Sequence, residues 1–112
     1  AEALDYVGVL GVEFFVVTED GGEGLRVNEI APRVHNSGHW TMGGAVTCQF
    51  EQHIRAACGW PLGATTRRAR RVEMTNLIGD SAGDWRVLAG QPGIELHLYG
   101  KRDPRPVRLT DK

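Results

Sequence analysis

Residues Asn28 to Thr41 contain most of the side chains in this sequence that could bind a ligand or carry out a reaction. These fourteen positions hold one carboxylate, one guanidinium, two imidazoles, two amides and two hydroxyls, interrupted by a proline and a glycine. Asn, Ser, Gly and Pro favour turns, and charged side chains among them are costly to bury without partners. A polar loop of this kind is typical of a binding or catalytic site that rigid elements hold in place.

A β-hairpin is predicted directly before this loop. Tyr6–Thr18 is rich in Val and Phe and predicts a strand, Glu19–Gly24 has the composition of a tight turn, and Leu25–Ala31 predicts the returning strand. A turn centred within its segment places Glu13 opposite Glu29 or the immediate neighbour of Glu29.

The predicted pair of Glu13 and Glu29 requires an explanation, because like charges directly opposed across two strands are destabilising. The residues around Glu13 are largely Val and Phe, so we expect this carboxylate to interrupt a buried apolar face. Either one carboxylate is protonated, or a cation lies between them. Magnesium suits the second arrangement, because it is held by one or two carboxylates together with substrate phosphates. A slipped register that leaves both side chains in solvent is the remaining alternative.

The residues after the polar loop predict a helix and then a second compact piece. Thr47–Cys58 is expected to be an amphipathic helix, since Phe50 and Ile54 recur at helical spacing, and Gly59 can cap its end. The boundary between the two pieces is expected within Thr65–Arg71. The later elements are predicted as a strand at Val72–Ile78, a short helix at Asp84–Leu88 and a strand at Ile94–Tyr99.

The composition is that of an ordinary globular domain, with 112 residues, 41% hydrophobic and 24% charged. The formal net charge of −1 gives no electrostatic reason to expect nucleic acid or a membrane as a partner. No apolar run approaches the roughly 20 residues that span a bilayer. Cys48 and Cys58 fall in one predicted helix, too far apart for a disulfide, so we expect reduced thiols and a cytoplasmic protein.

Several familiar site patterns are weak or missing. His35 and His39 have the spacing of zinc ligands on one helical face, but Asn36, Ser37 and Gly38 between them predict a loop. The sequence contains no G-x-S-x-G elbow, no P-loop and no dinucleotide-binding glycine motif.

The side chains that remain form a set suited to phosphoryl transfer. Two carboxylates can hold a metal ion, while guanidinium, imidazole and amide donors can bind an anion beside it. Phosphoryl transfer is catalysed mainly by such positioning and charge neutralisation. The candidate residues are Glu13, Glu29, Arg33, His35 and Asn36.

Several runs of the sequence closely resemble the 5-(carboxyamino)imidazole ribonucleotide synthases, ATP-grasp enzymes of purine biosynthesis. The resemblance extends over nearly the whole chain, and its most specific part is the His-Asn-Ser-Gly-His run. Other ATP-grasp enzymes share the two acidic positions but not this run. The resembling runs are Gly11–Phe15, Asn28–Arg33, His35–Thr41, Gln49–Glu51, Pro61–Gly63, Met74–Gly79 and His97–Lys101.

The resemblance implies ATP-dependent carboxylation of 5-aminoimidazole ribonucleotide by bicarbonate, through a carboxyphosphate intermediate. It implies that magnesium is held by Glu13 and Glu29, and that ATP lies beside Asn28 and Glu29. The residues implied to face bicarbonate and the transferring phosphate are Arg33, His35 and Asn36. The resemblance also implies a cytoplasmic homodimer whose ligands are small molecules.

The implied fold is α+β. Residues 1–66 would form the carboxy-terminal part of an ATP-grasp domain, a hairpin plus a helix, and residues 67–112 a small β-rich carboxy-terminal domain.

We expect the amino-terminal half of such an enzyme to precede Ala1, so this chain alone should be inactive. Family members continue from a Pro-Arg-Pro-like segment into Gly-Arg-Lys-x-Gly-His, whereas Pro104–Arg108 here leads directly to Leu109. Another ATP-grasp carboxylase, a bifunctional purine enzyme and a non-catalytic interaction module stay open as alternatives.

Overall fold

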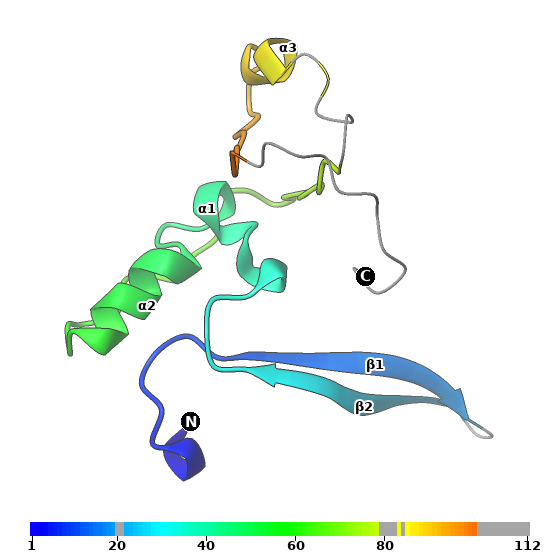
Figure 1. Cartoon of the computed structure of the whole chain (residues 1–112), viewed down its shortest axis with the longest axis vertical. Coiled ribbons are helices and arrows are strands. Elements are labelled where there is room, and N and C mark those ends of the chain that lie inside the picture. The colour runs from blue at the N-terminus through cyan, green and yellow to red at the C-terminus, as the bar shows by residue number, and fades with distance from the viewer. Residues whose placement is uncertain (20–21, 79–82, 84, 101–112) are drawn as a thin grey trace. The chain divides into compact units, whose positions relative to one another are not determined.

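The structure is a computed structural model that describes residues 1–19, 22–78, 83 and 85–100 (Figure 1). It contains one antiparallel hairpin and several helices, which confirms the predicted α+β class. The elements are η1 (Glu2–Leu4), β1 (Gly11–Glu19), β2 (Gly22–Ala31), η2 (Asn36–Gly38), α1 (Thr41–Gly44), α2 (Gln49–Ala57) and α3 (Trp85–Ala89).

The chain divides into two compact units, Ala1–Met74 and Thr75–Lys112, and each is considered by itself. A division into compact units is not a division into domains. The domain boundary expected between residues 66 and 67 therefore stays a prediction.

The hairpin confirms two antiparallel strands in the predicted register, but β2 begins at Gly22 and not at Leu25, because the ladder already includes the pair of Glu19 and Gly22. β1 and β2 pair antiparallel, and Glu13 lies directly opposite Glu29. The ladder is irregular between Glu13 and Phe14, because Phe14 pairs with Val27 and leaves Asn28 as an extra residue in β2. This arrangement is a β-bulge, a feature that re-aims side chains near functional sites. The turn prediction falls partly on residues 20–21, which lie outside the described residues.

Strand β1 begins at Gly11, so the prediction that it starts at Tyr6 was wrong. Gly8 has a φ angle of 145°, which an extended strand residue does not adopt. The backbone N–H of Val9 donates to Nδ1 of His53 at 3.2 Å instead of to a neighbouring strand. The backbone groups ahead of Gly11 are therefore used for other contacts.

Helix α2 agrees with the predicted helix but is shorter at both ends. Its carboxy-terminal end has the pattern of a Schellman cap, in which a residue in the left-handed conformation lets two later N–H groups reach back. Gly59 has a φ angle of 66° and donates to the Ala56 carbonyl at 3.0 Å, while Trp60 donates to the Arg55 carbonyl at 2.8 Å. The capping role expected of Gly59 is confirmed.

In the second unit, α3 confirms the predicted short helix, although Asp84 lies outside the described residues. The strands predicted at Val72–Ile78 and Ile94–Tyr99 were wrong, since neither segment is a strand in its described residues. Apolar alternation favours a strand only where a neighbouring strand satisfies its backbone groups. Within the described part of the chain, neither segment has such a neighbour. The departure at Pro104–Arg108 also lies outside that part.

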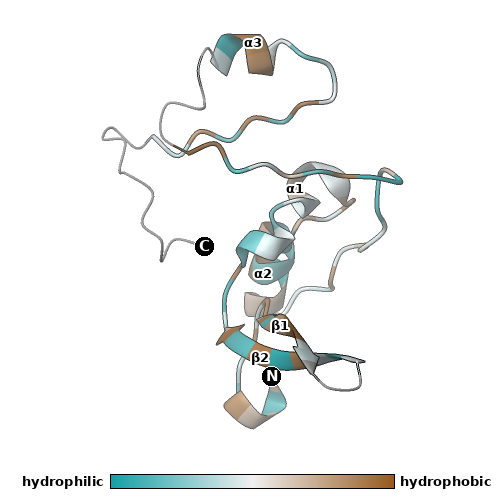
Figure 2. Ribbon diagram, turned by 90° about the vertical axis from the view of Figure 1, so that its right-hand side faces the viewer, coloured by the Kyte–Doolittle hydropathy of each residue, from teal (hydrophilic) through white to brown (hydrophobic). Residues whose placement is uncertain are grey.

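The hairpin exposes apolar side chains on both faces, so the expectation that Glu13 interrupts a buried surface was wrong for this chain. Figure 2 shows hydrophobic and hydrophilic residues side by side along both strands. A two-stranded sheet buries a face only when a second layer packs on it. The exposed apolar residues include Val12, Phe14, Phe15, Val16, Leu25, Val27 and Ile30.

Among the described residues, the buried apolar side chains are those of Ala31 and Ala45, and no large side chain is fully buried. None of the helices that the structure describes is both long enough and apolar enough to cross a membrane.

We expect the isolated 112-residue chain to unfold without a cooperative transition. It removes too little apolar surface from water to offset the conformational entropy lost on folding. Far-UV circular dichroism should change gradually on heating, and a hydrophobic dye should bind before heating begins. A sharp melting transition of a chain that sedimentation shows to be monomeric would contradict this expectation.

Candidate metal centre

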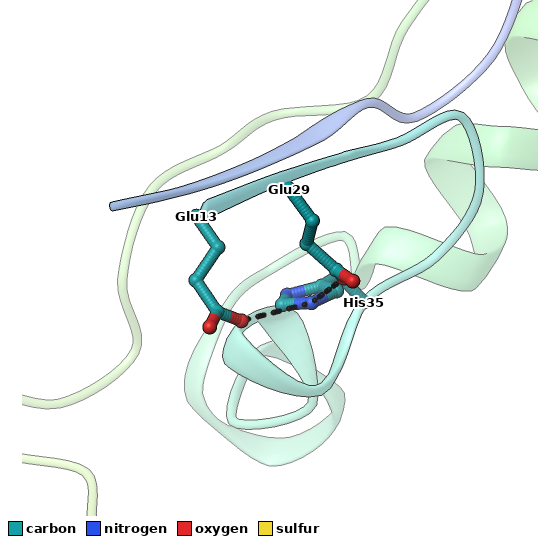
Figure 3. A group of neighbouring side chains, drawn as sticks. All are labelled: Glu13, Glu29 and His35. Carbon is teal, nitrogen blue, oxygen red and sulfur yellow. Dashed lines mark hydrogen bonds and ion pairs between the residues drawn. The ribbon is translucent and has the colours of Figure 1, made fainter. Parts of the chain in front are cut away.

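Glu13, Glu29 and His35 converge at the end of the hairpin nearest the polar loop (Figure 3). Each offers one potential ligand atom, and these three atoms lie within 4.8 Å of one another. The two carboxylates come from opposed positions of β1 and β2, whereas His35 comes from the loop that follows β2. Hairpin register and loop path together assemble the cluster.

The bulge in β2 adds a hydrogen-bond donor to this cluster. Asn28, the extra residue, donates through Nδ2 to Oε1 of Glu13 at 2.6 Å. In a regular ladder, neighbouring residues point to opposite faces, so Asn28 and Glu29 could not both approach Glu13. The bulge lets the side chains of Asn28 and Glu29 both lie near the Glu13 carboxylate.

His35 bridges the two carboxylates and is nearly buried, with 9% of its surface exposed. Its Nε2 lies 3.1 Å from Oε1 of Glu29 and 3.5 Å from Oε2 of Glu13. On the other side of the ring, Nδ1 accepts from the backbone N–H of Ser37 at 3.3 Å. A backbone N–H can only donate, so Nδ1 carries no proton in this arrangement and Nε2–H donates to the carboxylates. His35 thus lies between two like charges as a hydrogen-bond donor.

Gly11 allows His35 to approach the hairpin this closely. A Cβ atom at Gly11 would lie 2.9 Å from Cβ and 3.0 Å from Cγ of His35. Those separations are well inside ordinary carbon contact distance. The first residue of β1 must therefore lack a side chain for His35 to reach Glu13 and Glu29.

Arg33 lies beside the cluster without being held tightly in it. Its Nη2 is 3.6 Å from Oε1 of Glu29, and its side chain is 60% exposed. Its Nη1 donates to the carbonyl of Val34 at 3.0 Å. An exposed ion pair of this length contributes little stability, so most of the guanidinium remains available to a ligand.

Asn36 is not brought into the cluster. It is the first residue of η2 and is exposed, and its side chain has no hydrogen-bond partner among the residues that the structure describes. Of the predicted site residues, the structure therefore assembles Glu13, Glu29 and His35, with Asn28 and Arg33 in contact with them.

Sequence reasoning assigned no role to Gln49, which contacts both His35 and His39. The available signal was a polar residue at the start of a helix whose apolar residues predict burial of one face. That signal indicates that a polar side chain is buried, but not what it binds.

The chain is similar to known proteins over most of its length. Residues 1–50 match the ATP-grasp domain family, and residues 73–108 match the phosphoribosylaminoimidazole carboxylase C-terminal domain family. The N5-carboxyaminoimidazole ribonucleotide synthase of Vibrio vulnificus strain YJ016 is 56% identical over 101 residues, which are 90% of this chain and 25% of that protein. The chain is thus similar to about a quarter of an N5-carboxyaminoimidazole ribonucleotide synthase.

Solved synthase structures agree with this similarity. The N5-carboxyaminoimidazole ribonucleotide synthetase of Thermus thermophilus is 53% identical, with a TM-score of 0.77 over 96% of this chain and 28% of that one. The Aspergillus clavatus synthase, solved in complex with ADP and 5-aminoimidazole ribonucleotide, is 36% identical, with a TM-score of 0.70 over 90% of this chain and 28% of that one.

The chain spans only about a quarter of the length of the curated synthases that it matches, 25% in the Vibrio vulnificus protein. All three cluster residues lie within the part that matches the ATP-grasp domain. The carboxylate pair therefore lies in the part of the chain that matches the ATP-grasp domain family, and not in the part that matches the carboxylase C-terminal domain family.

Gly11→Ala in a full-length synthase that contains this chain should lower kcat/KM. Overpacking of a tight contact costs about 1 to 3 kcal/mol, and a penalty of that size on the site corresponds to a loss of about 5- to 150-fold. Gly24→Ala is the matched control, because its nearest contact would be an ordinary 3.6 Å to Cγ2 of Val17 in the same hairpin. Equal activity of the two variants would show that the approach of His35 to Gly11 is unimportant.

Proposed function

We propose that this chain supplies the metal-binding and anion-facing part of an enzyme that carboxylates 5-aminoimidazole ribonucleotide. Bicarbonate attacks the γ-phosphorus of ATP, which releases ADP and forms carboxyphosphate. The substrate amine then attacks the carboxyl carbon, which forms a carbon–nitrogen bond and releases phosphate. The observation that carries this proposal is the opposed pair of Glu13 and Glu29, bridged by His35, within a segment matched to ATP-grasp domains.

The donor set of the cluster fits magnesium. Glu13 and Glu29 present hard carboxylate oxygens close together, and magnesium is commonly held by one or two carboxylates plus substrate phosphates. When bound, the ion would neutralise charge on the nucleotide phosphates. Asn28 orients the Glu13 carboxylate through its 2.6 Å hydrogen bond, and the same segment would lie beside ATP.

His35 holds the two carboxylates in place by hydrogen bonding. Its Nε2–H satisfies Glu29 at 3.1 Å, while its nearly complete burial fixes the direction of the ring. A polarised N–H held in this way limits the reorganisation needed when charge builds up nearby.

Arg33 provides the positive charge for the anionic reactants. Its side chain is more than half exposed, with one bond to the Val34 carbonyl and a long contact with Glu29, so its other donors can engage bicarbonate or the transferring phosphoryl group. Asn36, exposed at the start of η2, offers an amide to the same reactants.

The resemblance to the synthases also favours a cytoplasmic homodimer. Sedimentation of the full-length protein would test whether it is a dimer.

Glu29→Gln in the full-length protein should abolish ATP hydrolysis, with a loss of more than about a hundredfold, while the melting temperature stays near that of the wild type. The amide keeps the shape of the side chain but removes the negative charge that a cation needs. Glu23→Gln, an exposed carboxylate on the same strand, is the matched control and should retain activity. Unchanged ATP hydrolysis in Glu29→Gln would remove Glu29 from the metal site.

Arg33→Ala should reduce bicarbonate-dependent turnover by about tenfold or more, because a hydrogen bond to a charged group contributes about 1.5 to 3 kcal/mol. Nucleotide affinity, measured by titration with ADP, should change much less. Arg71→Ala is the control, since Arg71 is also exposed and pairs with a glutamate, Glu73, at 2.9 Å. Equal losses of turnover and nucleotide affinity in Arg33→Ala would contradict the assignment.

A further inference from the structure

The carboxamide of Gln49 forms a two-point clamp on the backbone of His35. Oε1 of Gln49 accepts from the His35 backbone N–H at 3.0 Å, and Nε2 of Gln49 donates to the His35 carbonyl at 2.9 Å. A backbone N–H can only donate and a carbonyl can only accept, so the two bonds fix which end of the amide is oxygen. Gln49 is buried, with 7% of its surface exposed, and water cannot easily replace these bonds.

The same amide determines the tautomer of His39. Nε2 of Gln49 lies 2.7 Å from Nδ1 of His39, and this nitrogen is already identified as the donor end of the amide. Nδ1 of His39 must therefore accept, which leaves the proton of the neutral ring on Nε2. The ring of His39 also packs against Phe50, with 5.6 Å between centroids and a 37° tilt. Amide and aromatic ring together fix both the tautomer and the orientation of His39.

The surrounding loop is shaped to admit this amide. A Cβ atom at Gly38 would collide with Oε1 of Gln49, so a larger residue at that position would displace the amide from the His35 backbone. Oγ1 of Thr41 accepts from the Gln49 backbone N–H at 2.9 Å and itself donates to the carbonyl of Gly38. The loop and the first turn of α2 thus form one connected hydrogen-bond network.

We propose that Gln49 is a positioning residue of the active site. Its carboxamide holds His35 against Glu13 and Glu29, and it keeps His39 in the tautomer that presents an N–H at Nε2. The kinetic part of this proposal rests on the carboxylation activity proposed above, whereas the tautomer assignment does not.

Gln49→Glu tests the clamp with little change in shape. A carboxylate can still accept from the His35 N–H but has no hydrogen to donate to the His35 carbonyl or to His39. His39 should then place its proton on Nδ1, where the new oxygen can accept it. Long-range proton–nitrogen spectra of the full-length protein, labelled at histidine and recorded at a pH where the ring is neutral, distinguish the two tautomers. The His39 signals are assigned by their loss in His39→Gln.

Gln52→Glu is the matched control within the same helix. Gln52 clamps Gly63 in the same two-point manner, donating to its carbonyl at 2.7 Å and accepting from its N–H at 3.0 Å, but it contacts no residue of the cluster. Gln49→Glu should lower kcat at least tenfold with the KM for ATP within about twofold of the wild type. Gln52→Glu should leave both kcat and the His39 tautomer unchanged.

Three results would overturn the proposal. A wild-type spectrum with the His39 proton on Nδ1 contradicts the clamp geometry, and equal loss of kcat in both glutamate variants makes Gln49 merely structural. Unchanged kcat in Gln49→Glu removes its positioning role. If the wild-type protein shows no carboxylation of 5-aminoimidazole ribonucleotide, the proposed function fails, while the tautomer spectra still decide the role of Gln49 toward His39.

Discussion

Two carboxylates face each other across a two-stranded hairpin, and their repulsion has to be offset for the strands to keep this register. Glu13 and Glu29 are directly opposed, and the groups nearest to them are an amide N–H from Asn28, the Nε2–H of His35 and the guanidinium of Arg33. Each of these groups donates a hydrogen bond or carries positive charge. The polar loop after β2 can therefore be understood as the set of donors that two opposed acids require.

Holding those donors in place requires contacts from outside the loop. His35 reaches the carboxylates because Gly11 has no side chain and because Gln49, fourteen residues later in the sequence, binds both polar groups of the His35 backbone. The bulge at Asn28 is a second such device, since it places two consecutive residues against one carboxylate. The precision of the site thus comes from a glycine, a bulge and a buried amide, none of which is itself a reactive group.

The hairpin exposes apolar side chains on both of its faces. The sequence corresponds to about a quarter of the Vibrio vulnificus synthase, and both faces of the hairpin carry large apolar side chains in contact with solvent. A sheet with two apolar faces is suited to lie between other layers of a protein. Under the proposed function, Glu13 and Glu29 would provide acidic ligands for a cation, and other elements would complete the site around a nucleotide.

Local patterns in the sequence predicted the hairpin, its register, helix α2 with its Gly59 cap and the short helix α3. They failed for the strands at Val72–Ile78 and Ile94–Tyr99, because strand formation depends on a neighbour that local patterns do not specify. They also placed β1 too early, since the contact between Val9 and His53 joins residues far apart in the chain.

For the site, the sequence by itself determined which residues carry charge, and it predicted that Glu13 would lie opposite Glu29 or its neighbour, because hairpin register follows from turn position and two-residue periodicity. The structure decided between this register and a slipped one. Only the tertiary structure decided that His35 bridges the carboxylates, that Asn36 stays apart from them, and that Gln49 fixes the main chain of His35. These outcomes depend on side-chain direction and on contacts between distant segments. A sequence pattern records neither of them.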